Sequence, residues 1–238
     1  MSTLGTGFGR AVGDYQRGRP GYPADAVAWL LHGVTGPVAD VGAGTGKLTA
    51  EVRRLGFDVT AVDPDEHMLA ALRDALPAVP TVVGTGESLP FASGSLGALT
   101  YGQSWHWVDV PRASAQAARV LRPGGTLGLI WNLRNDAVEW VAALGRAMNS
   151  ELSESISGAQ DVPVDAPFGD IEARAWHWEH PMSADDVHAM VRSRSYYIAS
   201  NDDFRARVDA GVSEVLAALG DGPILMPYVT HAFRAARP

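Results

Sequence analysis

Short apolar runs alternate with segments of helical spacing along most of the chain, and this alternation predicts its secondary structure. Each apolar run ends in small or acidic residues, which is typical of parallel strands joined by crossover helices. Gly56, Pro77 and the turn at 123–125 would end the helices. We expect strands over 38–41, 58–62, 81–83, 98–101 and 126–131, with helices between them over 47–55, 66–76 and 111–121.

The alternation of apolar runs and helical segments is lost after Asn132. A helix over 137–149 precedes a polar, turn-rich stretch over 150–170, which is the expected place for an insertion or a mobile lid. No internal repeat interrupts the pattern, so we expect one α/β domain with additions. The later expected elements are a strand over 171–180, helices over 184–194 and 204–219, and a last strand over 224–233.

Composition narrows the classes of function. The chain has 238 residues, 46% of them hydrophobic, and can bury one substantial core. Its formal net charge of −8 repels polyanions and Lys47 is its only lysine, so we expect no nucleic acid partner. The absence of cysteine excludes disulfides and cysteine-ligated metals. No apolar run approaches the roughly 20 residues of a membrane span, so we expect a cytoplasmic protein without a membrane partner.

A glycine-rich loop, Asp40–Gly46, lies between an expected strand and an expected helix. A phosphate-binding P-loop would need glycine where Val41 stands and serine or threonine where Leu48 stands. A dinucleotide fingerprint would need glycine in place of Lys47. The spacing therefore excludes a P-loop and disfavours a nicotinamide dinucleotide.

Two acidic residues end the first two strands. A carboxylate at Asp40, facing the crevice, would repel a pyrophosphate and attract the sulfonium and ammonium groups of S-adenosylmethionine. The alternative is that Asp40 only accepts hydrogen bonds from the loop amides. Asp63 stands about 20 residues beyond the loop, where an acidic group receives a ribose diol. Its alternative role is to cap the helix that follows.

With these features in place, the chain resembles the class I S-adenosylmethionine-dependent methyltransferases. Within them it is similar to the small-molecule group of trans-aconitate methyltransferase-like proteins, with a methyltransferase type 11 domain. The motifs that carry this resemblance extend over nearly the whole chain, and they are Tyr15–Pro23, Val41–Gly46, Val62–Pro64, Gly84–Phe91, Gln103–Trp107, Arg119–Gly125, Trp131–Asn132 and Arg192–Tyr196.

The resemblance implies a Rossmann-like, doubly wound and mostly parallel seven-stranded sheet with an antiparallel last strand, an N-terminal segment and a small helical cap. In this single domain, 1–35 would form a closing segment with the first helix, 36–132 the cofactor-binding core, and 133–238 the cap helices and last strands. The implied cofactor is S-adenosylmethionine, with no metal. The implied partner is a small-molecule substrate, in a monomer or homodimer.

The resemblance also assigns roles to individual residues. The implied cofactor-binding residues are Asp40, Gly42, Ala43, Gly44, Gly46, Asp63, Pro64, Met68, Thr85, Gly86, Glu87 and Gln103. For Glu87 a purely structural role, holding its loop, is the alternative. The implied substrate or lid residues are Tyr15, Arg19, Tyr22, Trp105, Trp107, Trp131, Asn132, Arg194 and Tyr196.

His106 is the candidate catalytic residue, since it follows the fourth strand and is expected at the crevice along the carboxyl ends of the strands. It could take a proton from an acceptor hydroxyl, orient a carboxylate, or only pack between Trp105 and Trp107. The expected reaction is methylation of a small molecule at oxygen, nitrogen or carbon. The competing functions are an S-adenosylmethionine-binding relative that transfers no methyl group, such as a cyclase-type catalyst or a regulator, and an NAD-dependent oxidoreductase.

Overall fold

The computed structural model describes residues 18–148, 162–220 and 222–238. Seven strands form one sheet in the order β3-β2-β1-β4-β5-β7-β6. β7 runs antiparallel to both of its neighbours, and the other pairings from β3 to β5 are parallel. This confirms the expected Rossmann-like sheet with its antiparallel last strand. The strands are β1 (Val38–Val41), β2 (Val59–Asp63), β3 (Thr81–Val83), β4 (Leu96–Gly102), β5 (Leu121–Arg134), β6 (Ile171–Met182) and β7 (Ile224–Ala236).

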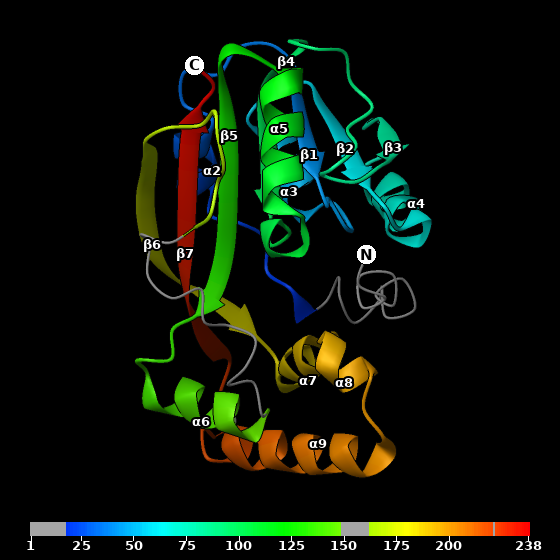
Figure 1. Ribbon diagram of the computed structural model, residues 1–238. Coiled ribbons are helices and arrows are strands. Elements are labelled where there is room, and N and C mark those ends of the chain that lie inside the picture. The colour runs from blue at the N-terminus through cyan, green and yellow to red at the C-terminus, as the bar shows by residue number, and fades with distance from the viewer. Residues whose placement is uncertain (1–17, 149–161, 221) are drawn as a thin grey trace.

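Helices cover both faces of the sheet (Figure 1). On one face α5 (Val110–Val120) packs through Ala113, Ala117 and Val120 on β4 and β5. On the other face α2 (Ala24–Leu30) and α3 (Lys47–Arg54) contribute a second apolar cluster with β1. α4 (Glu66–Ala75) lies beside β2 and β3. The two clusters sandwich the sheet, as expected of a doubly wound fold.

Four helices form a cap at the end of the sheet opposite the chain's C-terminus (Figure 1). Apolar side chains from all four enclose a third cluster with Met226 and Tyr228 of β7. These helices are α6 (Glu139–Ala147), α7 (Ala184–Arg192), α8 (Ser195–Ile198) and α9 (Asp202–Ala217). The expected small helical cap is therefore present.

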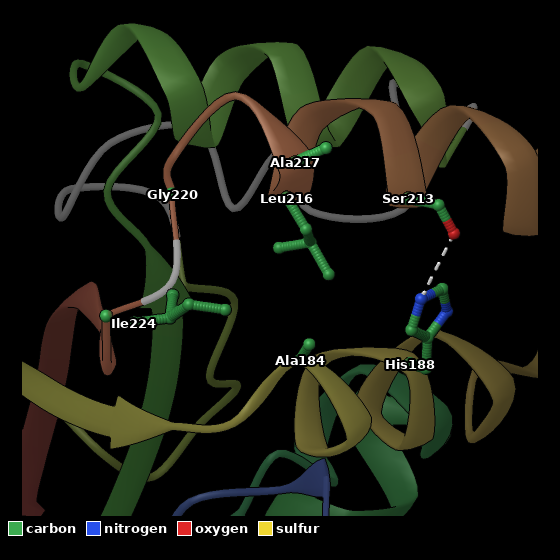
Figure 2. A pocket seen from close by; sticks show the side chains of 8 residues that line it. Ala184, His188, Ser213, Leu216, Ala217, Gly220 and Ile224 are labelled. Atoms are coloured by element: carbon green, nitrogen blue, oxygen red, sulfur yellow. Dashed lines mark hydrogen bonds between the residues drawn. The ribbon is translucent and has the colours of Figure 1, made fainter.

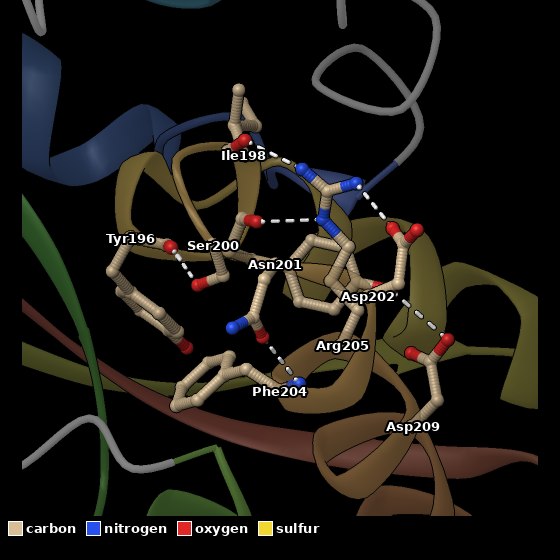
Figure 3. A network of polar contacts seen from close by, with 9 residues as sticks. Tyr196, Ile198, Ser200, Asn201, Asp202, Phe204, Arg205 and Asp209 are labelled. Carbon is tan, nitrogen blue, oxygen red and sulfur yellow. Dashed lines mark hydrogen bonds and ion pairs between the residues drawn. The ribbon is translucent and has the colours of Figure 1, made fainter.

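Side-chain hydrogen bonds fix where the cap helices begin. Ser183 and Asp186 form a reciprocal capping box at the start of α7. At the start of α9 the Asn201 side chain accepts a hydrogen bond from the Phe204 amide at 2.9 Å (Figure 3). Arg205 then ties α9 to α8 by donating to the Ile198 carbonyl at 2.8 Å. These contacts hold the connection between α7 and α9 in one conformation.

The described part of the turn-rich stretch expected over 150–170 packs against the core of the sheet. Val162 and Phe168 are buried against the α5 side of the sheet. The Pro163 carbonyl accepts a hydrogen bond from the indole nitrogen of Trp105 at 2.8 Å, and the Asp165 amide donates to Ser114 at 3.0 Å. Residues 162–168 are thus anchored to the core and do not form a free lid, because apolar side chains interrupt the polar stretch. The remainder of the expected lid, 150–161, lies outside the described residues.

In the described parts of the chain, no helix is both long enough and apolar enough to span a bilayer.

Candidate active site

The glycine loop joins β1 to α3 through backbone conformations that favour glycine. Gly42, Gly44 and Gly46 have φ values of 68°, 56° and 87°. A Cβ on Gly42 would lie 2.5 Å from the Ser104 Cβ, so space as well as dihedral angle requires glycine there. The amides of Gly42 and Ala43 donate to the Val62 carbonyl at 2.8 and 3.0 Å. The loop is therefore held against the end of β2.

Asp63 supports this loop from the end of β2. One carboxylate oxygen accepts from the Gly44 amide at 2.8 Å, and the other accepts from the Asp65 amide at 2.9 Å. Asp65, whose side chain accepts from the His67 amide, is the residue that caps α4. The alternative in which Asp63 caps that helix is therefore wrong. Burial raises the pKa of Asp63, and the two amide hydrogen bonds lower it.

Asp40 does not face the crevice. Its carboxylate is fully buried under the loop, where it accepts hydrogen bonds from the Thr49 hydroxyl at 2.6 Å and the Thr100 hydroxyl at 3.1 Å. The expectation of a crevice-facing carboxylate is wrong, because the side chain is buried and its two oxygens accept from hydroxyls of α3 and β4. The alternative, in which Asp40 accepts hydrogen bonds from the loop amides alone, is wrong as well, because its donors include the hydroxyls of Thr49 on α3 and Thr100 on β4. Asp40 can act on a ligand only through its field.

The segment after β3 packs inward. Gly86 is buried, and a Cβ there would lie 2.9 Å from a Val108 methyl carbon and 3.3 Å from the Tyr101 hydroxyl. The Glu87 carboxylate accepts a hydrogen bond from the Asp109 amide at 2.9 Å, just before α5. This contact favours the structural role for Glu87. Thr85 pairs with Ser88 in an isolated bridge, which keeps the segment compact.

Two of the expected substrate-contacting tryptophans belong to the core. Trp105 is 1% exposed and packs edge-to-face on Tyr101. Trp131 is 3% exposed and packs edge-to-face on Phe233. Their assignment as residues that contact substrate is wrong, since both side chains point to the α5 side of the sheet. Trp107, by contrast, is 47% exposed and lies beside His106.

His106 is held by one of these buried tryptophans. The Trp131 indole nitrogen donates to Nδ1 of His106 at 3.4 Å. The residue is exposed, yet partial burial of the ring and then the charge of Arg19 lower its pKa, so the ring is neutral at pH 7. A neutral ring that accepts at Nδ1 carries its proton on Nε2. His106 therefore has a hydrogen-bond donor at Nε2, but its side chain is not among those that line the small cavity beside the glycine loop.

Five residues expected from the sequence meet around one small cavity. Its volume is about 30 Å³, and it lies where β1, β4 and β5 end. The side chains come from the N-terminal segment, the core and the cap, as the resemblance implied. Three further lining residues, Pro20, Lys47 and Tyr228, were not expected; for Lys47 the signal was its place directly after the glycine loop. The expected lining residues are Arg19, Tyr22, Gln103, Asn132 and Arg194.

Asn132 fastens the N-terminal segment to the sheet. Its side-chain amide donates to the Gly21 carbonyl at 2.8 Å and accepts from the Thr230 hydroxyl at 2.6 Å. Gln103, which has a φ of 55°, donates from its side chain to the Asn132 carbonyl at 2.8 Å. These bonds fix two walls of the cavity.

The other expected residues lie away from this cavity lining. Tyr196 packs against the apolar cluster of the cap, and Met68 is a buried residue of α4. Pro64 is exposed between β2 and α4. Tyr15 lies outside the described residues.

A larger cavity, of about 460 Å³, lies within the cap (Figure 2). Small residues such as Ala184, Ala217 and Gly220 open it between α7, α9 and the start of β7. His188 and Ser213 lie 3.4 Å apart on its wall. None of the expected site residues lines it, so the site is assigned to the small cavity beside the glycine loop.

Comparison with known proteins decides the family. Residues 39–129 match the model of a methyltransferase domain. An uncharacterized methyltransferase from Mycobacterium tuberculosis is 40% identical over 232 residues, which are 96% of this chain and 94% of that protein. The chain belongs to the methyltransferase family. The matched segment runs from β1 into β5 and contains the glycine loop, Asp63 and His106.

Two solved structures share the fold of the methyltransferase. A candidate type II methyltransferase from Anaeromyxobacter dehalogenans has a TM-score of 0.67 and 25% identity, covering 92% of this chain and 97% of its own. The Haemonchus contortus phosphoethanolamine N-methyltransferase 2, in complex with S-adenosylhomocysteine and its phosphorylated ligand, has a TM-score of 0.57 and 15% identity. It covers 100% of this chain and 61% of its own. Both confirm the class I methyltransferase architecture.

The methyltransferase has polar groups that suit a nucleoside at the loop. Among the described residues, the Thr45 hydroxyl in the glycine loop and the Tyr101 hydroxyl beside Gly86 are buried without a hydrogen-bond partner. Buried polar atoms in this state need a partner from outside the protein or cost stability. Both lie beside segments that the sequence assigned to the cofactor, so the residues present fit S-adenosylmethionine.

Asp40 gives the methyltransferase a measurable pH dependence. Burial raises the pKa of Asp40 to about 6, and the hydroxyls of Thr49 and Thr100 only partly oppose this. An acid whose pKa is higher in the folded than in the unfolded chain gains stability as the pH falls. Between pH 7 and pH 5 the wild type should gain about 1 kcal/mol of unfolding free energy from the protonation of Asp40. Asp40→Asn should lack this gain, so the variant becomes less stable relative to the wild type as the pH falls.

Urea unfolding of both proteins at the two pH values measures this difference. Asp58→Asn, at an exposed carboxylate, is the matched control and should show a smaller change. A difference for Asp40→Asn that is constant across the range would show that this buried carboxyl group does not titrate there.

Proposed function

We propose that the protein transfers the methyl group of S-adenosylmethionine to a small-molecule acceptor, at oxygen, nitrogen or carbon. The observation that carries this proposal is the cavity beside the glycine loop, which side chains from the N-terminal segment, the core and the cap line together. In an open α/β sheet, ligands bind at the carboxyl ends of the strands, where this cavity lies. A related fold, that of the Haemonchus contortus enzyme, carries S-adenosylhomocysteine.

The small-molecule character of the acceptor follows from size and charge. The cavity is narrow and is walled by Tyr22 and Asn132, so a bulky macromolecular surface does not reach it directly. The net charge of −8 disfavours a nucleic acid as the acceptor. A monomer or homodimer without a membrane partner, and a cytoplasmic location, stay predictions of the sequence.

The chain's own residues would act mainly by positioning. When bound, S-adenosylmethionine supplies an electrophilic methyl group on a sulfonium. The glycine loop and Asp63 would hold the nucleoside, with the carboxylate of Asp63 accepting from the ribose diol. Tyr22, Gln103 and Asn132 would exclude water from the reacting centre. His106 would donate a hydrogen bond from Nε2 to the acceptor and so fix its orientation.

The test measures binding before turnover. Calorimetric titration with S-adenosylhomocysteine is expected to show saturable binding, whereas NADH is expected to show none. Transfer of radiolabelled methyl groups from S-adenosylmethionine to a panel of small hydroxyl, amine and carboxylate compounds then tests catalysis. Binding of NADH alone would favour an oxidoreductase, and S-adenosylhomocysteine binding without any methyl transfer would favour the non-methylating relative.

His106→Ala is expected to lower kcat/KM by about tenfold, the effect of one lost hydrogen bond of about 1.4 kcal/mol. His106→Gln, which retains an N–H donor, should keep most of the activity. The S-adenosylhomocysteine dissociation constant should change by less than about twofold in both variants. His32→Ala, at an exposed position just after α2, is the control. Equal losses in the Ala and Gln variants would indicate a base instead of a donor.

A further inference from the structure

The cavity within the cap has the size of a ligand site. Its volume of about 460 Å³ falls within the roughly 300 to 1,000 Å³ that is usual for small-molecule sites in proteins. Of the lining residues that the structure describes, none is shared with the small cavity beside the glycine loop. A molecule bound in the cap would therefore lie apart from the proposed methyl-transfer site.

The floor of the cap cavity is apolar. Leu216 of α9 and Ile224 of β7 are only 8% and 7% exposed and belong to the apolar cluster of the cap. Ala184 of α7 and Ala217 of α9 line the same space, and their short side chains leave it open (Figure 2). Burial of apolar surface against these side chains is favourable, so the floor suits a compact hydrocarbon group.

One end of the cap cavity is polar. There His188 of α7 faces Ser213 of α9, with Nε2 of the ring 3.4 Å from the hydroxyl oxygen, which is longer than an ordinary hydrogen bond (Figure 2). The Ser213 hydroxyl also donates to the Asp209 carbonyl at 2.8 Å. On the other side of the ring, Nδ1 lies 3.9 Å from Oδ1 of Asp209, and within the described residues both atoms are buried without a hydrogen-bond partner. The protein itself thus uses the hydrogen-bonding capacity of His188 incompletely.

A hydroxyl group of a ligand matches this polar end in either tautomer of His188. If Nε2 carries the ring proton, the ligand oxygen accepts it and the ligand proton can go to the Ser213 oxygen. If Nδ1 carries the proton and faces Asp209, the ligand donates its own proton to Nε2. A carboxylate can only accept and an ammonium can only donate, so each fits one of these arrangements and not the other.

The surrounding charges favour a neutral ligand. Asp209, the acidic group that faces His188, forms an ion pair with Arg192 at 3.3 Å and accepts from the Tyr197 hydroxyl at 3.0 Å. Because Arg192 balances the charge of Asp209, this wall attracts neither a cation nor an anion strongly. A charged group brought from water to the apolar floor without a counterion would lose hydration at a large cost.

We propose that the cap cavity binds a neutral small molecule with a compact apolar body and a hydroxyl group, that is, an alcohol or a phenol. The apolar body would lie on Leu216 and Ile224, and the hydroxyl would form its hydrogen bond with His188 beside Ser213. This second small-molecule site is separate from the site of methyl transfer and does not depend on the proposed function.

The experiment titrates the full chain with four probes that share one apolar body, and follows binding by NMR of the protein. The probes are phenethyl alcohol, its methyl ether, phenethylamine and hydrocinnamate, and a second series has cyclohexyl in place of phenyl. The alcohol of at least one series should bind with a dissociation constant on the order of 1 mM, as expected for so small a ligand. It should bind at least about fivefold more tightly than the other members of its series.

Two variants locate the probe in the cap cavity. His188→Phe should abolish the preference for the alcohol over the ether, while the ether should bind the variant and the wild type to within about twofold. Ala217→Leu, which fills the cavity, should weaken binding of the alcohol by about tenfold or more. Ala218→Leu is the matched control, because it places the same side chain at the next, exposed position of the chain and outside the lining, and it should leave binding unchanged.

Four outcomes would overturn the proposal. They are that the alcohol of neither series binds, that a charged member of a series binds as tightly as its alcohol, that His188→Phe keeps the preference for the alcohol, and that Ala217→Leu binds the alcohol as the wild type does. Saturation with S-adenosylhomocysteine should leave binding of the alcohol unchanged. Displacement by the nucleoside would place the probe beside the glycine loop and would also overturn the proposal, whereas failure of S-adenosylhomocysteine to bind would contradict only the proposed function.

Discussion

Gly42→Ala is expected to cost at least about 2 kcal/mol of unfolding free energy and to weaken S-adenosylhomocysteine binding by more than about tenfold. Two effects combine at this position. Gly42 has a φ of 68°, which disfavours any residue with a Cβ by about 1 to 2 kcal/mol. The added Cβ would also lie 2.5 Å from the Ser104 Cβ, an atom that no side-chain rotation can move away.

Gly94→Ala is the matched control for this prediction. Gly94 has a φ of 65°, but a Cβ there would meet nothing within 4 Å. Its replacement should therefore cost only the dihedral penalty of about 1 to 2 kcal/mol and leave nucleoside binding unchanged. Chemical unfolding and calorimetry measure the two quantities separately.

A second variant separates the overlap from the dihedral angle. Ser104→Gly removes the Cβ that the methyl group introduced by Gly42→Ala would strike, at the cost of the hydrogen bond from the Ser104 hydroxyl to the Val41 carbonyl. Combined with Gly42→Ala, it should restore part of the lost stability relative to the sum of the single changes. Strict additivity of the two changes would show that overlap with Ser104 is not the cause.

Asp63→Ala is expected to weaken S-adenosylhomocysteine binding by at least about tenfold. The carboxylate accepts from the amides of Gly44 and Asp65 and, in the proposed function, also from the ribose diol. Its removal leaves the buried Asp65 amide and the partly buried Gly44 amide without their acceptor, which costs up to about 1 to 3 kcal/mol for each group. Loss of loop support and loss of the diol contact therefore both oppose binding.

Two comparisons separate these causes for Asp63. Asp65→Ala removes the N-cap of α4 and should cost about 1 kcal/mol of stability with little change in affinity. An S-adenosylhomocysteine analogue that lacks both ribose hydroxyls should bind wild type and Asp63→Ala more nearly equally than the parent nucleoside does. If Asp63→Ala weakens the analogue and the parent to the same extent, the carboxylate supports the loop and does not contact the ribose.

Elements with a clear periodic pattern could be predicted from the sequence almost residue by residue. The strands at Val38–Val41 and Thr81–Val83 match the expectation, because their apolar runs are bounded by breakers. β5 and β7 are longer than expected, at Leu121–Arg134 and Ile224–Ala236. Both continue at their ends where each pairs with the other, from Thr126 opposite Ala236 to Arg134 opposite Tyr228, and β5 begins early where Leu121 pairs with Leu96 of β4. Pairing between distant segments extends a strand beyond its local signal.

Some residues expected at the site line the cavity and others do not, and the difference lies in the direction in which each side chain points. Trp131 and Asn132 are neighbours, and both were expected at the site. Because side chains alternate along a strand, Trp131 turns into the α5-side core and Asn132 turns to the cavity. Trp105 is likewise drawn into the core, where its ring packs on Tyr101. A motif gives the position of an aromatic residue but not the face on which it is buried.

The sequence by itself determined the α/β fold, the position of the glycine loop and the acidic residue that ends the second strand, since these depend on local spacing. Only the tertiary structure decided that Asp40 is buried, that Trp131 holds His106, and that Arg19, Lys47 and Arg194 line one cavity. Local spacing constrains neighbours within a few residues, whereas burial and charge depend on which distant segments pack together. This cavity exists because the closing segment, the core and the cap meet there.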